Sequence, residues 1–172
     1  MSDSLIGSAP SLDEPLEILE ACHGRIEHQL ATLERLADHL PAAGLDGQAR
    51  QAAATVIRYF DTAGQHHHED EEVDLFPKLL QRADEGVQTL VSQLLDDHAR
   101  MSTTWGALRR VLMGIREGRE EMLDRAAVSA FAALYRQHIA RENTELLPLA
   151  RRTLTMAEIT AMSLAMTRRR RG

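Results

Sequence analysis

An internal repeat with a spacing of 71 residues constrains the fold of this chain more than any other feature. Both copies read F-x6-H-x3-E-x3-L-x-P. The repeated residues are Phe60, His67, Glu71, Leu75 and Pro77 in the first copy, and Phe131, His138, Glu142, Leu146 and Pro148 in the second. A histidine and a glutamate four residues apart lie on one face of a helix. The repeat therefore predicts two equivalent helices, each with an imidazole and a carboxylate on the same face.

The remaining sequence has the pattern of long helices joined by short connections. Apolar residues recur at three- and four-residue steps from Leu16 to Leu36, which is the period of one helix face. Capping-box patterns at Ser11–Glu14 and Thr155–Glu158 mark two helix starts. The expected helices run from about residue 12 to 41–44, 47 to 83, 85 to 117, 120 to 152 and 155 to 166, with a kink at Pro77 in the second.

These helices predict an all-α fold, namely an antiparallel up-down four-helix bundle with a short C-terminal fifth helix. The aromatic content of 3% argues against a β-sandwich or barrel. We expect residues 1–10 to be a disordered arm, residues 11–152 to form the bundle, and residues 153–172 to form the short helix and a basic tail. The arginines at 168–171 are expected to be solvated within that tail.

Charge and composition exclude several classes of partner. The formal net charge of −6 argues against nucleic acid as the main partner. No apolar run approaches the roughly 18 residues of a membrane-spanning helix, and the N-terminus lacks the basic and apolar segments of a signal peptide. The single cysteine, Cys22, excludes an intramolecular disulfide and fits a reducing compartment. We therefore expect a cytoplasmic protein without a membrane partner, whose oligomeric state the sequence leaves open.

Two further histidines complete a candidate metal site, because they add an imidazole from the first and third helices. The candidate ligands are His23, His67, His98 and His138 as nitrogen donors, with Glu71 and Glu142 as carboxylates that can each bridge two metals. Each of two metals would then receive two nitrogens and two oxygens, and an oxo or hydroxo bridge would leave a sixth position open. Imidazole and carboxylate without thiolate suit iron or manganese better than a structural zinc site.

Several neighbouring residues have a less specific interpretation. His66 and His68 point about 100° to either side of His67 on a helix, so we expect them on the outer face or in support of a ligand. Glu27, one turn after the first histidine, is an alternative third carboxylate, and Cys22 is expected to be a small buried hydrophobe. Residues that either pack in the core or line the open position are Met101, Trp105 and Tyr135.

The segments H-x3-E-E-x2-LFP and H-x3-E-N-x2-LLP, with single histidines on the first and third helices, resemble the hemerythrin-like (HHE cation-binding) proteins. The resemblance covers roughly residues 12–150. It implies an antiparallel four-helix bundle with a non-heme di-iron centre held by the six candidate ligands. Animal hemerythrins place a second histidine one turn after the one on the third helix. Ser102 stands there in this chain, so the sequence is more similar to the bacterial versions with four histidines and two glutamates.

The expected function is that of a non-heme di-iron-binding protein with an open coordination site for O₂, NO or a related small oxidant. Such a protein would act in sensing or in nitrosative or oxidative stress handling, without being an enzyme, and manganese or zinc could replace the two iron ions. The alternative is an iron donor or reductase-like protein in the repair of iron–sulfur centres. A metal-free interaction module is disfavoured, because six inward polar groups would be costly to bury. A ferritin-like oxidase needs two E-x2-H motifs, and this chain has one, at Glu20 and His23.

Overall fold

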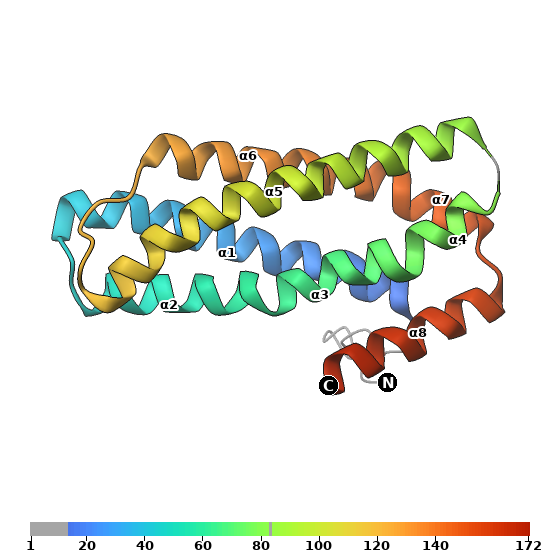
Figure 1. Ribbon diagram of the computed structural model, residues 1–172, viewed down its shortest axis with the longest axis horizontal. Helices are drawn as coiled ribbons and strands as arrows, with labels where there is room; N and C mark the ends of the chain where they lie inside the picture. The colour runs from blue at the N-terminus through green and yellow to red at the C-terminus, as the bar shows by residue number, and fades with distance from the viewer. Residues whose placement is uncertain (1–13, 83) are drawn as a thin grey trace, which may run out of the picture.

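Four antiparallel rods of helix form a bundle in a computed structural model, which describes residues 14–82 and 84–172 (Figure 1). Within those residues there is no strand, so the predicted all-α fold is confirmed. The elements are α1 (Pro15–Ala43), α2 (Gly47–Asp61), α3 (Ala63–Glu69), the π-helix η1 (Asp70–Leu75), α4 (Phe76–Leu80), α5 (Glu85–Glu117), α6 (Arg125–Arg141), the π-helix η2 (Glu142–Leu146), α7 (Leu147–Thr153) and α8 (Met156–Arg171).

Aspartates and glycines set the ends of these rods. The side chains of Asp46, Asp84 and Asp124 accept backbone N–H groups at the starts of α2, α5 and α6, which satisfies donors that a helix start leaves free. Gly44 and Gly118 follow α1 and α5 with φ of 80° and 77°, a region that favours glycine. Short polar turns therefore reverse the chain and make neighbouring rods antiparallel.

Several helix boundaries differ from the sequence-based expectation. The fourth rod begins at Arg125 rather than near residue 120, because the N–H groups of Arg119 and Glu120 bond to a carbonyl at the end of α5. Helix α1 ends at Ala43, within the expected range of 41–44, with Pro41 inside its last turn and Gly44 directly after it. The second rod is interrupted at Thr62 and ends at Leu80. The expected disordered arm and residues 11–13 of the first capping box lie outside the described residues. Helix α1 begins at Pro15 with Glu14 as its N-cap, rather than near residue 12.

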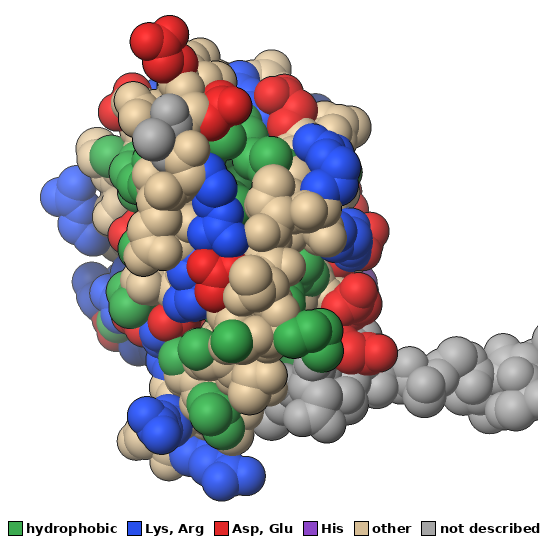
Figure 2. Space-filling model, turned by 90° about the vertical axis from the view of Figure 1, so that its right-hand side faces the viewer, with side chains coloured by type: hydrophobic (Ala, Val, Ile, Leu, Met, Phe, Trp, Pro, Cys, Tyr) green, Lys and Arg blue, Asp and Glu red, His purple; other side chains and the backbone are tan. Residues whose placement is uncertain are grey.

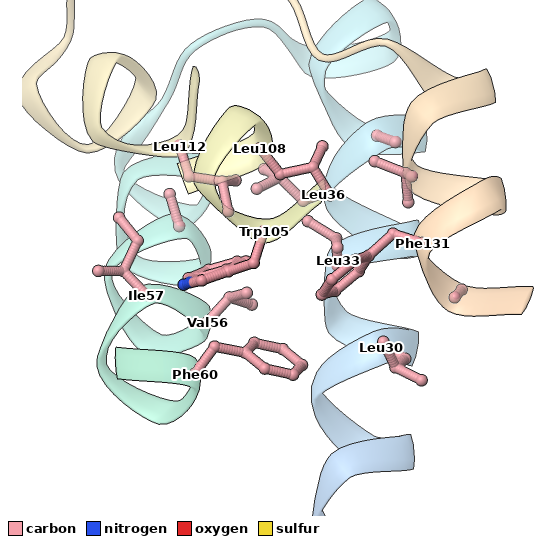
Figure 3. Packing of buried hydrophobic residues seen from close by; sticks show 14 of the residues in the cluster. Leu30, Leu33, Leu36, Val56, Ile57, Phe60, Trp105, Leu108, Leu112 and Phe131 are labelled. Carbon is pink, nitrogen blue, oxygen red and sulfur yellow. The ribbon is translucent and has the colours of Figure 1, made fainter. Parts of the chain in front are cut away.

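The apolar core is divided into two clusters by a polar layer. One cluster extends from Ile26 on α1 toward the α1–α2 end of the bundle and contains Phe60, Trp105 and Phe131 (Figure 3). The other extends from Cys22 in the opposite direction and includes residues of α4, α7 and α8. The candidate metal ligands lie between the two. Burial of both clusters fixes which side of each rod points inward, because a rotation of any helix would expose its apolar stripe.

Both copies of the repeat contain a π-helical turn at the same register. The glutamate of each H-x3-E motif opens or lies within it, and its carbonyl accepts the N–H five residues later: Phe76 bonds to Glu71, and Leu147 bonds to Glu142. Pro77 and Pro148 are the second residues after these turns. A proline lacks the N–H of an α-helical turn and clashes with the carbonyl four residues back. The wider turn accommodates the proline, so it replaces the simple kink expected at Pro77.

The last helix, α8, packs alongside the bundle near α4, against η1 and α1 (Figure 1). Figure 2 shows this end of the molecule, on which basic, acidic and apolar side chains are mixed. The predicted capping box at Thr155 and Glu158 is confirmed at its start. Helix α8 continues through Arg171. Arg168 and Arg171 are exposed, as expected, but Arg169 and Arg170 are not part of a solvated tail. Arg169 and Arg170 both pair with Asp70, and Arg169 also pairs with Asp74 at 2.8 Å. A long-range ion network therefore connects the C-terminus to the turn that carries Glu71.

Among the described residues, no helix has the length and apolar character needed to cross a membrane.

Candidate metal centre

All six residues proposed from the sequence come together in the polar layer between the two apolar clusters. Their side chains are at most 5% exposed. Each rod contributes: α1 carries His23, α3 carries His67, α5 carries His98, α6 carries His138, and the π-helical turns carry Glu71 and Glu142. The ligand atoms form two groups. Group one contains His23, His67, Glu71 and Glu142, and group two contains His98, His138, Glu71 and Glu142.

Both glutamates belong to both groups because their two oxygens face in different directions. For Glu71, Oε1 lies 3.2 Å from Nε2 of His67, and Oε2 lies 3.2 Å from Nε2 of His98. For Glu142, Oε2 lies 2.8 Å from Nε2 of His23, and Oε1 lies 2.6 Å from Nε2 of His138. All four histidines thus present the same ring nitrogen to the carboxylates. Within each group, the four ligand atoms lie within 4.8 Å of one another.

The buried polar atoms of this layer fit a cation. Both oxygens of Glu71 and Glu142, Nε2 of His23 and both ring nitrogens of His67 lack a hydrogen bond with acceptable geometry. Buried polar groups are normally satisfied, and two adjacent buried carboxylates oppose each other's ionisation. Seven such atoms in one layer therefore indicate that something outside the chain completes it, and the mixture of imidazole and carboxylate donors suits a metal ion.

The pKa shifts in this layer indicate that protons balance part of the negative charge of the buried carboxylates when no metal is bound. Burial, and then the charge of Glu142, raises the pKa of Glu71 well above its ordinary value. Burial would also raise the pKa of Glu142, but contacts with His138, His23 and His67 hold it well below its ordinary value. Burial and the neighbouring His138 lower the pKa of His98. Metal ligands must lose their protons, so binding here should release protons and depend on pH.

The outer nitrogens of three of the histidines are held by residues that the sequence analysis did not select. Nδ1 of His98 lies 2.6 Å from Glu72, and Nδ1 of His138 lies 3.2 Å from Asp97. Nδ1 of His23 lies 2.7 Å from Oδ1 of Asn143. Such partners orient a ligating imidazole and select its tautomer. A sequence signal for two of them existed, since Glu72 and Asn143 are separated by the same 71 residues as the repeat.

The neighbouring residues with a less specific interpretation fall in different places. Glu27 is outside both groups, with 49% of its side chain exposed, and pairs with Arg136. His66 is half-buried and also outside both groups. The ring of His68 stacks on His98 with centroids 3.9 Å apart, and burial lowers the pKa of His68 well below its ordinary value. His68 therefore packs against the ring of the candidate ligand His98.

Cys22 lies in the second apolar cluster, as expected of a small buried hydrophobe, but its sulfur also has polar neighbours. It is buried, but Arg25 donates a hydrogen bond to its sulfur at 3.0 Å. Burial raises the pKa of a thiol, yet interactions with His67 and Arg25 bring the pKa of Cys22 below its ordinary value. The thiol lies against the His67 ring without satisfying hydrogen-bond geometry.

A cavity of about 80 Å³ lies beside group two. Its wall includes His68, which stacks on His98, and Met101, Trp105 and Tyr135, so these core residues also line a cavity. Gln65 and Ser102 line it as well and are exposed, so the mouth of the cavity lies at these two residues. The indole N–H of Trp105 bonds to Asp61 at 3.1 Å, and Arg109 also pairs with Asp61. These contacts with Asp61 hold Trp105, and with it one wall of the cavity, in place.

The bundle and its layer of four histidines and two glutamates define a helical protein with a buried site suited to metal. Comparison with known proteins gives the family: the Hemerythrin HHE cation binding domain matches residues 14–150. The chain belongs to this family. It is also 30% identical over 158 residues to a Haemophilus influenzae protein described as an "Uncharacterized protein". That similarity covers 92% of this chain and 91% of the relative.

Proposed function

We propose that this chain holds two iron ions side by side, bridged by Glu71 and Glu142. The observation that carries the proposal is the division of each carboxylate between two histidine pairs. One oxygen of each glutamate lies near a histidine of group one, and its other oxygen lies near a histidine of group two. A carboxylate in this orientation can bridge two ions. Two imidazoles and two carboxylate oxygens per ion suit iron or manganese.

The chain supplies fewer ligands than iron usually accepts, so a coordination position stays open at each ion. When bound, iron would supply reversible binding of O₂, NO or a related small oxidant at such a position. The residues of the chain hold the ligands on four rigid rods and keep bulk water out with an apolar cluster on either side. We expect such a site to serve in sensing these molecules or in nitrosative or oxidative stress handling.

The cavity beside group two is the route by which we expect the small molecule to approach. Its volume of about 80 Å³ exceeds the roughly 30 Å³ that one water molecule occupies in the liquid. Its walls are largely aromatic and apolar, from Phe60, Trp105 and Tyr135. Ser102 stands at its mouth with Gln65, at the position where animal hemerythrins carry a histidine, and its side chain takes up less of the entrance than a histidine would.

Metal analysis combined with ligand binding tests this proposal. Purified protein, reconstituted anaerobically with ferrous iron, should hold about two iron atoms per chain, and its optical spectrum should change on addition of NO or air. One zinc ion per chain, or no retained iron, would overturn the dinuclear assignment. Iron that leaves rapidly to a chelator, without any spectral response to NO or O₂, would favour the iron-donor alternative.

A pair of substitutions at the mouth tests the route. Ser102→Leu should slow NO binding to the ferrous protein in stopped-flow measurements, because the larger side chain fills the entrance. Thr103→Leu is the matched control, since Thr103 is the next residue on α5, is exposed and is not among the residues that line this cavity. Equal rates for the two variants would mean that ligands enter elsewhere.

A further inference from the structure

The two groups of ligands share their carboxylates but differ in what holds their histidines. In group two, both outer nitrogens face carboxylates: His98 Nδ1 lies 2.6 Å from Oε1 of Glu72, and His138 Nδ1 lies 3.2 Å from Oδ2 of Asp97. An anionic acceptor behind an imidazole draws its N–H proton and makes the opposite nitrogen a stronger donor to a metal. Both nitrogen ligands of group two therefore have this support.

Group one has no carboxylate in the equivalent places. Nδ1 of His23 lies 2.7 Å from the amide oxygen of Asn143, which is neutral. Nδ1 of His67 has no hydrogen-bond partner among the described residues, and its ring lies against the thiol of Cys22. Arg25 donates to that thiol, so a cation is also near group one. The imidazoles of group one are therefore weaker donors than those of group two.

We infer that the two metal positions are inequivalent: Glu72 and Asp97 make the His98/His138 position of group two the tighter one, which fills first. Glu72 and Asp97 are positioning residues, because each acts through a histidine and neither belongs to the two ligand groups. The inference rests on the proposed dinuclear function. It goes beyond that function because it states which half of the centre holds its ion more strongly and which residues cause the difference.

The internal repeat supplies the matched comparison. Glu72 and Asn143 occupy equivalent positions, one residue after each carboxylate ligand. Each contacts Nδ1 of a histidine on a neighbouring rod, His98 for Glu72 and His23 for Asn143. The two halves of the centre thus have the same backbone arrangement at these two positions and differ there by one charge, that of Glu72. That difference is partly offset, because Glu72 is 42% exposed and Asp97 also lies 3.6 Å from Arg141. Surface exposure and competing cations weaken such effects without abolishing them.

A stepwise metal titration tests the assignment. Full-length protein is stripped of metal and titrated anaerobically with Co²⁺, and the two dissociation constants are compared among variants. Two unequal constants arise in any dinuclear site from repulsion between the ions, so the variants make the assignment. Glu72→Gln and Asp97→Asn should each weaken the first constant about 10- to 100-fold, the usual effect of losing such a partner, and should leave the second nearly unchanged.

The converse substitution is Asn143→Asp, which gives group one the carboxylate that group two already has. It should strengthen the second constant and leave the first unchanged. Circular dichroism of each metal-free variant controls for folding, and these isosteric changes preserve side-chain volume. If Glu72→Gln weakens the second constant, or if Asn143→Asp strengthens the first, the order of filling is reversed and the inference is wrong.

Proton NMR of the half-loaded cobalt protein provides a second readout. Exchangeable imidazole N–H signals shifted by the paramagnetic ion should number two, from His98 and His138. Glu72→Gln should shift one of them, and Asn143→Asp should shift neither. Movement of a signal by Asn143→Asp alone would place the first ion in group one and overturn the inference, while the dinuclear function would stand. Failure of the wild type to bind a second equivalent would instead overturn the proposed function.

Discussion

Removal of the arginines that reach back from α8 should destabilise the bundle strongly. Asp70 is 0% exposed, and its partners Arg169 and Arg170 are 15% and 28% exposed. Truncating both arginines leaves a buried carboxylate without a cation, and breaking a buried pair in this way typically costs about 3 to 5 kcal/mol. We therefore expect R169A/R170A to lower the free energy of unfolding by about that amount. Arg170→Ala alone should cost roughly 1.5 kcal/mol, because Arg169 still pairs with Asp70.

Urea unfolding of metal-free protein, followed by far-UV circular dichroism, measures this difference without the stability that a bound ion would add. The matched control is R168A/R171A, which removes two exposed arginines from the same turn of α8. That control should remain within about 0.5 kcal/mol of the wild type.

A rescue experiment isolates the cause. Asp70→Asn, added to R169A/R170A, removes the unpaired charge and should recover part of the lost stability. If R169A/R170A unfolds at the same urea concentration as R168A/R171A, the ion network contributes nothing measurable and the reasoning is refuted.

Three other expected outcomes follow from the structure. His67→Ala should lose most bound metal in elemental analysis, whereas His66→Ala and His68→Ala should keep most of it; retention in His67→Ala with loss in a neighbour would show that the helix face is misassigned. Leu33→Ala, at a site with 0% exposure, should lower the free energy of unfolding by about 2 to 5 kcal/mol in thermal melts, and a change near zero would contradict tight packing there. Arg82 lowers the pKa of Glu158 from 4.5 to about 2. A carboxylate with a depressed pKa stabilises the folded state above its unfolded pKa and loses that contribution as pH falls, so metal-free wild type and Glu158→Gln should differ in unfolding temperature above about pH 5 and converge as the pH falls toward 2; a constant difference would exclude this pair as the source.

Much of the architecture was predictable from local signals. The third helix has the predicted bounds at Glu85 and Glu117, because Asp84 and Gly118 are strong caps that act over a few residues. The 71-residue repeat predicted that the second and fourth rods are equivalent, and both copies contain the same π-helical turn before a proline. The turn itself was not predicted, since periodicity does not distinguish a π-helical turn from a kinked α-helix.

Other features were missed because their causes lie far apart in the chain. The arginines near the C-terminus have no local partner, and the sequence alone suggested a solvated tail. In the folded chain Asp70 is 99 residues from Arg169, and the two meet because α8 packs against η1. The sequence predicts a helix from about residue 120, whereas hydrogen bonds from Arg119 and Glu120 to the end of α5 hold the chain in a turn, and the helix begins only at Arg125.

The sequence by itself determined that two helices each carry a histidine and a glutamate on one face, because the spacing of His67 and Glu71 is a property of a single helix and is repeated at His138 and Glu142. The tertiary structure decided which residues contact the outer ring nitrogens of the histidines. Glu72 reaches His98 across 26 residues, and Asn143 reaches His23 across 120. Such contacts depend on how far each rod is rotated and shifted against its neighbours, which is set by burial of the two apolar clusters on either side of the polar layer. Periodicity along one helix contains no information about that rotation, so the difference between the two halves of the centre appears only in the folded chain.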